Sequence, residues 1–170
     1  MTINAMTRLK ILLVEDDPDR RARIEDLISS ITDTFELEVI VSYEEVLKEI
    51  GLNNHDAYLV SKEFSDNRGL EIIWEISGQG CRGPALVLAN DDDPELESEA
   101  VNLGAMIYLV RDQLSSRFLE RMIRHAIDRK RYEDNIRDNQ EDLIKRMMDL
   151  QDSSERFEAQ SVEYVQMAED

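Results

Sequence analysis

Five short apolar runs, each four or five residues long, recur in the first part of this chain. Most are continuous rather than alternating, and they span residues 11–14, 37–41, 57–60, 85–89 and 106–110. A strand with two apolar sides must be covered on both faces, which is the situation in parallel sheets flanked by helices. The runs therefore predict strands buried in a parallel sheet.

Segments with helical periodicity separate the five runs. Their capping signals are Asp17-Pro18 for the first, Ser42 and Gly51 for the second, Gly69 and Gly78 for the third, and Asp93-Pro94 and Gly104 for the fourth. Strands that alternate with helices through short loops are typical of an α/β fold with a doubly wound parallel sheet.

A long final helix is predicted because all six Gly and all three Pro lie at or before Gly104. We expect this helix to begin near Asp112 or Gln113. Its first turns need an apolar face to pack on the sheet, and the candidates are Leu114, Phe118, Met122, Ile123 and Ala126.

Beyond Arg131, apolar residues of this helix recur every seven positions, at Ile136, Leu143, Leu150, Phe157 and Tyr164. A helix of about 56 residues is roughly 84 Å long, more than the globular part can cover. Heptad spacing is typical of coiled coils, so we predict a homodimer through this helix; a frayed tail is the alternative. The predicted regions are a domain over 1–130 and a coiled-coil signalling helix or linker over 131–170.

The charge of the chain restricts its partners. The sequence has 38 Asp and Glu against 20 Lys and Arg, for a formal net charge of −18. This acidity argues against nucleic acid and anionic membranes as partners. A single Cys and the lack of a signal-like or membrane-spanning apolar segment indicate a cytoplasmic protein.

An acidic triplet, Glu15-Asp16-Asp17, directly follows the first predicted strand. In open α/β sheets, binding sites lie beyond the carboxyl ends of the strands. Carboxylates gathered there repel one another unless a cation such as Mg²⁺ or a neighbouring basic group holds them. We therefore select Glu15 and Asp16 as site residues, whereas Asp17 is also a candidate helix cap.

Several segments in order resemble the receiver domain of two-component response regulators, over about residues 8–130. They are ILLVEDDP (11–18), HDAYLVS (55–61), RGLEII (68–73), PALVLAN (84–90) and NLGAMIYLVRDQL (102–114). The resemblance implies a flavodoxin-like, five-stranded parallel sheet of order 2-1-3-4-5. It also implies a site in which a histidine kinase phosphorylates an Asp after strand 3, with Mg²⁺ held by the strand-1 acids.

Carried over by position, the resemblance places the acid pair on Glu15 and Asp16, a suitable but weak Mg²⁺ site. The phosphoacceptor position falls on Ser61. A Ser hydroxyl is a weak nucleophile without an activating base and cannot form an acyl phosphate, and it removes one anionic metal ligand.

The remaining family positions depart from the pattern in two of three cases. The switch hydroxyl falls on Ala89, and the phosphate-binding Lys falls on Arg111, whereas the switch aromatic is kept as Tyr108. We expect the guanidinium of Arg111 to pair with Glu15 or Asp16 in place of metal and phosphate.

The sequence thus predicts a degenerate receiver domain that is not an enzyme, carries no cofactor and acts in signal transduction by protein contact. Its expected partners are a second copy, and a histidine kinase or an output domain. The alternative is a phosphoacceptor receiver that uses a substitute acid, Glu63 or Asp66, or in which Ser61 replaces the natural Asp. A small-ligand sensor is a third reading. The helix lacks a stop signal near residue 170, so we expect a fragment of a longer protein.

Overall fold

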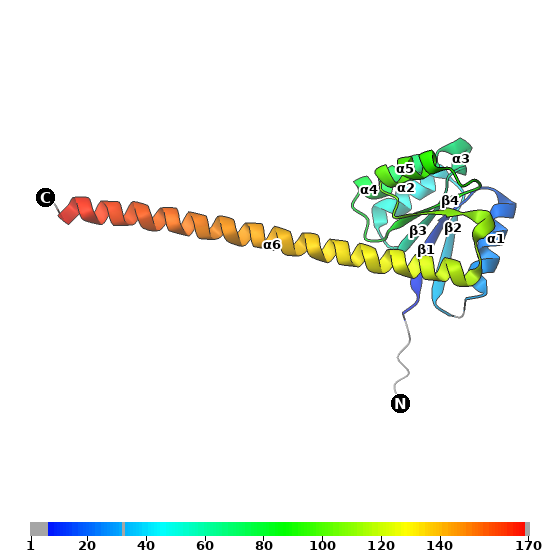
Figure 1. Ribbon diagram of the computed structural model, residues 1–170, viewed down its shortest axis with the longest axis horizontal. Helices are drawn as coiled ribbons and strands as arrows, with labels where there is room; N and C mark the ends of the chain where they lie inside the picture. The colour runs from blue at the N-terminus through cyan, green and yellow to red at the C-terminus, as the bar shows by residue number, and fades with distance from the viewer. Residues whose placement is uncertain (1–6, 32, 169–170) are drawn as a thin grey trace, which may run out of the picture. The chain divides into compact units, whose positions relative to one another are not determined.

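Strands and helices alternate along the chain in the computed structural model, which describes residues 7–31 and 33–168 (Figure 1). The elements are β1 (Leu9–Val14), α1 (Pro18–Ser29), β2 (Phe35–Ile40), α2 (Tyr43–Leu52), β3 (Ala57–Ser61), α3 (Phe64–Asn67), α4 (Gly69–Gly78), β4 (Ala85–Ala89), α5 (Pro94–Asn102), β5 (Ile107–Val110), the 3₁₀ helix η1 (Arg111–Gln113) and α6 (Ser116–Ala168). The outer limits of the two predicted regions, residues 1 and 170, lie outside the described residues.

The five strands form one parallel sheet in the order β2-β1-β3-β4-β5, which confirms the predicted fold. The central strand β3 is buried at all of its positions. Ser61, its last residue, lies opposite Leu88 of β4. The carboxyl ends of β1, β3 and β4 therefore lie side by side, and the loops that follow them share one edge of the sheet.

Alternate residues of each strand point into two separate cores, because successive side chains of a strand face opposite sides. Leu12 and Tyr58 belong to the core beneath α2, α4 and α5. Leu13 and Leu59 belong to the core beneath α1 and the first turns of α6 (Figure 1). Both faces are thus covered, which explains why β3 and β4 are buried at every position, whereas the edge strand β2 alternates with exposed Glu residues.

The final helix begins at Ser116, so the predicted start at Asp112 or Gln113 was wrong. Residues Arg111–Gln113 form a separate 3₁₀ turn. The hydroxyl of Ser115 then accepts a hydrogen bond from the backbone N–H of Phe118 over 3.1 Å, as an N-cap does.

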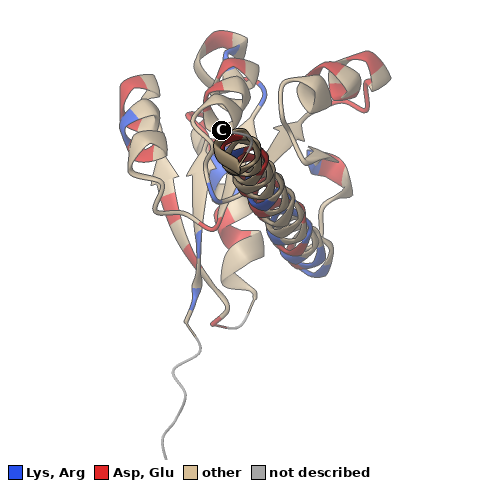
Figure 2. Ribbon diagram, turned by 90° about the vertical axis from the view of Figure 1, so that its left-hand side faces the viewer, with Lys and Arg blue, Asp and Glu red and all other residues tan. Residues whose placement is uncertain are grey.

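Two of the α6 side chains predicted to pack on the sheet, Ile123 and Ala126, are buried. The buried residues are Leu119, Ile123, Ala126 and Ile127. Phe118, predicted to pack on the sheet, is 39% exposed. The basic stretch 117–131 occupies the same turns, and its Lys and Arg residues are visible along the start of α6 (Figure 2).

The second helix also differs from its predicted end. It continues through Gly51 to Leu52, and Asn53 takes the left-handed conformation with φ 52°. Asn tolerates this conformation better than most side chains, so it can replace Gly as the terminating residue.

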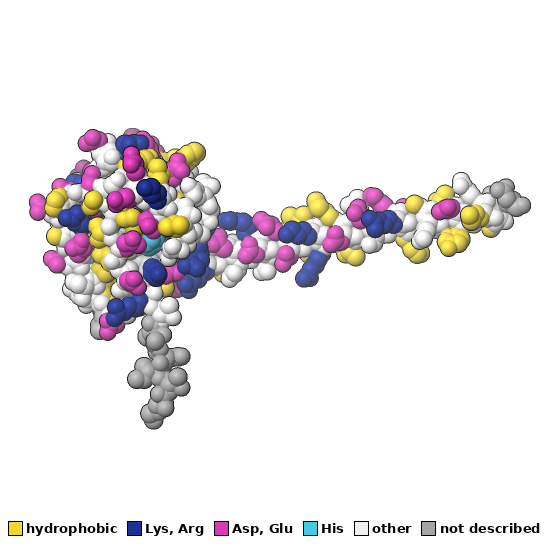
Figure 3. Space-filling view, turned by 180° about the vertical axis from the view of Figure 1, so that it is seen from behind, with side chains coloured by type: hydrophobic (Ala, Val, Ile, Leu, Met, Phe, Trp, Pro, Cys, Tyr) yellow, Lys and Arg dark blue, Asp and Glu magenta, His cyan; other side chains and the backbone are white. Residues whose placement is uncertain are grey.

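Contacts divide the chain into two units, Met1–Lys130 and Arg131–Asp170. Within the second unit the described residues are helical, and apolar side chains stand on its surface (Figure 3). Phe157 and Tyr164 are 74% and 69% exposed, respectively. No helix among the described residues combines the length and the apolar character needed to cross a membrane.

Candidate functional site

The acidic triplet after β1 divides into three different environments. Glu15 is fully buried, whereas Asp16 is exposed. Asp17 is the N-cap of α1, because its Oδ1 accepts hydrogen bonds from the N–H groups of Asp19 and Arg20 over 3.0 and 2.9 Å. The Arg20 hydrogen bond is the main cause of a lowered Asp17 pKa. Asp17 is therefore a structural residue of the helix start.

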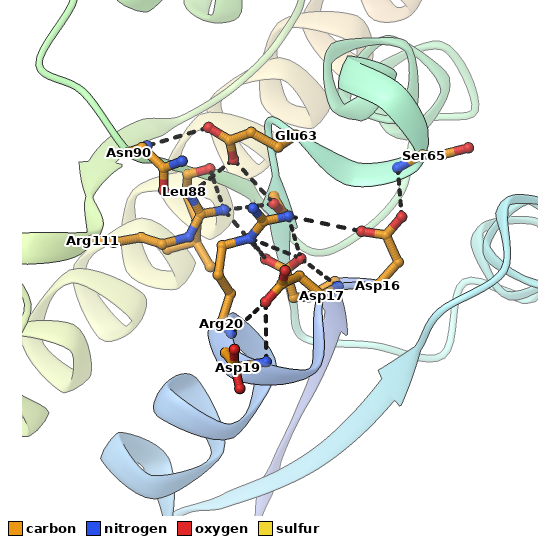
Figure 4. Close-up of polar contacts among 11 residues, drawn as sticks. Asp16, Asp17, Asp19, Arg20, Glu63, Ser65, Leu88, Asn90 and Arg111 are labelled. Carbon is orange, nitrogen blue, oxygen red and sulfur yellow. Dashed lines mark hydrogen bonds and ion pairs between the residues drawn. The ribbon is translucent and has the colours of Figure 1, made fainter.

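Arg111 directly follows β5, and its side chain extends into the site from the side opposite Asp16 and Asp17 (Figure 4). The residue is only 3% exposed. Its Nη2 donates hydrogen bonds to the hydroxyl of Ser61 over 2.5 Å and to the carbonyl of Leu88 over 3.2 Å. The same nitrogen lies 3.3 Å from the Oε2 of Glu15. The predicted pairing of Arg111 with the strand-1 acids is thus present, with Glu15 as the partner.

The other terminal nitrogen of Arg111 holds a second acid. Its Nη1 donates a hydrogen bond to the Oδ1 of Asn90 over 2.6 Å and lies 2.8 Å from the Oε2 of Glu63. Burial alone raises the pKa of Glu63, but the hydrogen bond and charge of Arg111 outweigh burial, so the pKa lies below its ordinary value. Glu63 is therefore an ionised partner of the guanidinium.

Arg20 of α1 brings a second guanidinium to Glu15, a contact that the sequence did not predict. The Nη2 and Nε of Arg20 donate to Oε1 of Glu15 over 3.1 and 3.2 Å. Arg20 also lies 4.0 Å from the Oδ1 of Asp16. The buried carboxylate of Glu15 is thus held between Arg20 and Arg111. The only sequence signal for Arg20 was its position on the first turn of the helix after the acids.

The loop after Ser61 is packed tightly against the site. A Cβ on Gly69 would lie 2.0 Å from the carbonyl oxygen of Ser61, so only Gly fits there. The short helix α3 has left-handed residues at 65–67, and the backbone N–H of Ser65 donates to the Oδ2 of Asp16 over 2.9 Å. Asp66, the other predicted substitute acid, is exposed, and none of the Arg111 contacts reaches it.

The two remaining family positions lie beside this cluster without entering its ion pairs. Ala89 is the buried last residue of β4. The hydroxyl of Tyr108, on β5, donates a hydrogen bond over 2.8 Å to the backbone carbonyl of Asp91, which follows β4. Partial burial raises the Tyr108 pKa. Tyr108 is thereby fixed to the loop between β4 and α5.

A divalent cation fits this arrangement poorly. The oxygens of Glu15 that would bind it already face two guanidiniums, and Arg111 lies where a positive ion would meet direct repulsion. Ser61 adds no charge, and Glu63 is engaged by Arg111. Arg20 and Arg111 are paired with Glu15, Asp16 and Glu63, and these pairs offset much of the negative charge of the three carboxylates (Figure 4).

Fold and site together define a doubly wound α/β domain with an acidic cluster at the carboxyl ends of its central strands. The family model for the response regulator receiver domain matches residues 11–124, and the chain belongs to this family. It is a receiver domain of two-component signalling, a class that interacts with histidine kinases and output domains. A comparison with curated proteins found no match.

Solved receiver structures share the fold at low sequence identity. A CheY-like receiver protein from Methanospirillum hungatei JF-1 is 19% identical, with a TM-score of 0.64 over 75% of this chain and 99% of that one. The signal receiver domain of a modulated diguanylate cyclase from Desulfovibrio desulfuricans G20 is 23% identical, with a TM-score of 0.62 over 74% and 98%.

One further similar structure was solved with a magnesium ion coordinated in its active-site cleft. It is the receiver domain of the sensor histidine kinase PA1611 from Pseudomonas aeruginosa PAO1. It is 21% identical, with a TM-score of 0.62 over 72% of this chain and 99% of that one. At these identities the similarity establishes the fold.

Proposed function

We propose that this protein is a receiver domain that signals without aspartyl phosphorylation. The observation that carries the proposal is the position of Arg111, whose guanidinium contacts the acceptor-position hydroxyl of Ser61 and the strand-1 acid Glu15 together. A permanent cation in the pocket replaces the metal and phosphoryl group that would otherwise switch the domain. The domain is thereby held in one conformation.

Ser61 is poorly suited to accept a phosphoryl group. It is fully buried, and its hydroxyl accepts from Arg111 while donating to Glu63 over 3.3 Å. Glu63 is a weak base because its pKa is lowered, so it activates the hydroxyl little. Glu63 is itself a poor substitute acceptor, because its carboxylate is bound to Arg111.

The signal would then pass by protein contact rather than by chemistry. We assign the receiver function to residues 1–130 and dimerisation to the helix 131–170, whose heptad residues such as Leu143 and Leu150 are exposed in the single chain. Burying these side chains against a second copy stabilises a parallel or antiparallel coiled coil. The proposed protein is cytoplasmic, non-enzymatic and connected to a histidine kinase or an output domain.

Incubation with acetyl phosphate and Mg²⁺, followed by intact mass measurement, tests the proposal. We expect no added phosphate on the natural chain. A triple variant, Ser61→Asp with Ala89→Thr and Arg111→Lys, restores the active residues and serves as the positive control. Uptake of one phosphate by the natural chain would contradict the proposal, and peptide mapping would show whether Glu63 accepts it.

Binding of Mg²⁺ offers a second measurement on the same two proteins. Calorimetry should detect no tight Mg²⁺ binding by the natural chain, because Glu15 and Glu63 are paired with Arg111. The triple variant should bind the ion, because Ser61→Asp supplies a carboxylate ligand and Arg111→Lys removes the guanidinium that pairs with Glu15 and Glu63. Tight binding by the natural chain would contradict the occupancy of the pocket by Arg111.

A further inference from the structure

A second cluster of ionisable residues lies before β3, at the end of that strand opposite Ser61. Its members are Glu38 of β2, Glu49 of α2 and His55, two residues before β3, and each offers one atom that can bind a metal ion. These three atoms lie within 4.8 Å of one another. The residues come from three elements, so only the folded chain brings them together.

His55 is an unusual member of this cluster because it is an ionisable side chain that is only 2% exposed. Its Nε2 lies 2.6 Å from the Oε2 of Glu38. Its Nδ1 has no hydrogen-bond partner among the described residues, although buried polar atoms are nearly always paired. The ring is steadied by a tilted contact with Tyr58, at 5.8 Å between centroids.

The cluster borders a small pocket of about 120 Å³. Its lining residues are Lys10, Glu36, Glu38, Glu49, Asn54 and His55. Three carboxylates against one ammonium leave the pocket negatively charged, which attracts a cation. The imidazole and carboxylate groups that could bind a metal ion therefore lie in a concave pocket whose charge attracts cations.

We propose that this pocket binds a divalent transition-metal ion of the Zn²⁺ class through His55, Glu38 and Glu49. One imidazole nitrogen with two carboxylate oxygens suits Zn²⁺, whereas Mg²⁺ and Ca²⁺ prefer all-oxygen ligands. The ion takes the place of the direct contact between His55 and Glu38, and water completes a four-coordinate shell. Glu38 is half exposed at its side chain, so it can move by the small distance that coordination requires.

Calorimetric titration of the full chain with Zn²⁺ tests this site, with Glu38→Gln, Glu49→Gln and Glu36→Gln as matched variants. Each substitution removes one negative charge from the same pocket, but only Glu38 and Glu49 belong to the ligand set. We expect one ion per chain, binding weakened by roughly tenfold or more in Glu38→Gln and Glu49→Gln, and a small change in Glu36→Gln. Thermal melts without metal verify that the variants are folded.

Co²⁺ substitution provides an independent spectroscopic measurement. Visible absorption of the Co²⁺ protein should show nitrogen and oxygen ligation without a thiolate band, because Cys81 is buried elsewhere. The signal should be lost in Glu38→Gln and kept in His125→Ala. Lack of saturable binding, equal weakening in all three Glu variants, or dependence on His125 would overturn the proposal. None of these outcomes bears on phosphorylation at Ser61.

Discussion

Arg111 donates a hydrogen bond over 2.5 Å to the hydroxyl of Ser61, the residue at the carboxyl end of the central strand. The contact joins the end of β5 to the end of β3 across the intervening strand β4. In the family pattern these positions carry a Lys and the phosphorylated Asp. Here Arg111 and Ser61 stand at these positions and are connected directly by this hydrogen bond.

Removal of the Arg111 guanidinium should destabilise the domain strongly. Arg111→Ala leaves Glu63 without its cation and Glu15 with Arg20 alone, both in low-dielectric surroundings. We expect a loss of about 3 kcal/mol in the free energy of unfolding, measured by urea denaturation. Arg21→Ala breaks a partly exposed pair with Glu25 and should cost less than about 1 kcal/mol. Equal losses would show that Arg111 has no special role.

Gly69 and Gly78, at the two ends of α4, offer a second matched pair. Ala at position 69 would place its Cβ 2.0 Å from the Ser61 carbonyl, whereas no atom lies within 4 Å of a Cβ at position 78. We expect Gly69→Ala to lower the free energy of unfolding, measured by urea denaturation, by about 2 kcal/mol or more. Gly78→Ala should be neutral or stabilising by about 0.5 kcal/mol. A neutral Gly69→Ala would mean that the loop after β3 yields easily.

The acid dependence of stability should reveal the pair between Glu63 and Arg111. Burial raises the Glu63 pKa, but Arg111 lowers it more, so the folded-state pKa lies below the ordinary value of 4.5. The ionised group therefore stabilises the fold fully above that value, and this stabilisation is lost as the pH falls through the folded-state pKa. The stability difference between the natural chain and Glu63→Gln should thus shrink on acidification.

Urea denaturation of both proteins between pH 7 and about pH 3 measures this difference. Glu158→Gln, at an exposed position of the long helix, serves as the control. Its difference from the natural chain should stay nearly constant over the same range. If the stability difference between the natural chain and Glu63→Gln grew toward low pH, Arg111 would not be holding the Glu63 carboxylate ionised.

The heptad residues of the long helix should determine the oligomeric state. Light scattering should give a dimer for the full chain and a monomer for residues 1–130. Leu143→Asp with Leu150→Asp should also give a monomer, because each places a charge in the proposed interface. Met148→Asp with Val162→Asp changes equally exposed apolar residues outside the seven-residue repeat and should leave a dimer. A monomeric full chain would remove the coiled-coil proposal.

Much of the fold was predictable because it depends on local pattern. The short apolar runs identified all five strands, and the start signals at Asp17-Pro18 and Asp93-Pro94 match helices in the structure. The start of α6 was less predictable, since residues 111–113 form a 3₁₀ turn that is compatible with a helical sequence. Local preferences differ little between these two helix types.

The site was predictable only at positions where a motif placed it. The prediction of Glu15 followed from the rule that sites lie at the carboxyl ends of parallel strands. The positions of Ser61 and Arg111 followed only from the resemblance to the receiver family. The roles of Arg20 and Asn90 depend on side-chain direction and reach, which no spacing rule specifies. The same holds for His55, whose partners Glu38 and Glu49 have no metal-ligand spacing in the sequence.

The amino-acid sequence alone determined the order of strands and helices, the covered sheet and the presence of Ser61 where the family resemblance expects an acceptor carboxylate. These properties follow from periodicity and from the identity of single residues. Only the tertiary structure decided that Arg111 contacts Ser61 and that Arg20 shares Glu15 with it. The reason is physical: a buried ion pair forms only where folding removes water and brings groups distant in the chain within hydrogen-bond distance.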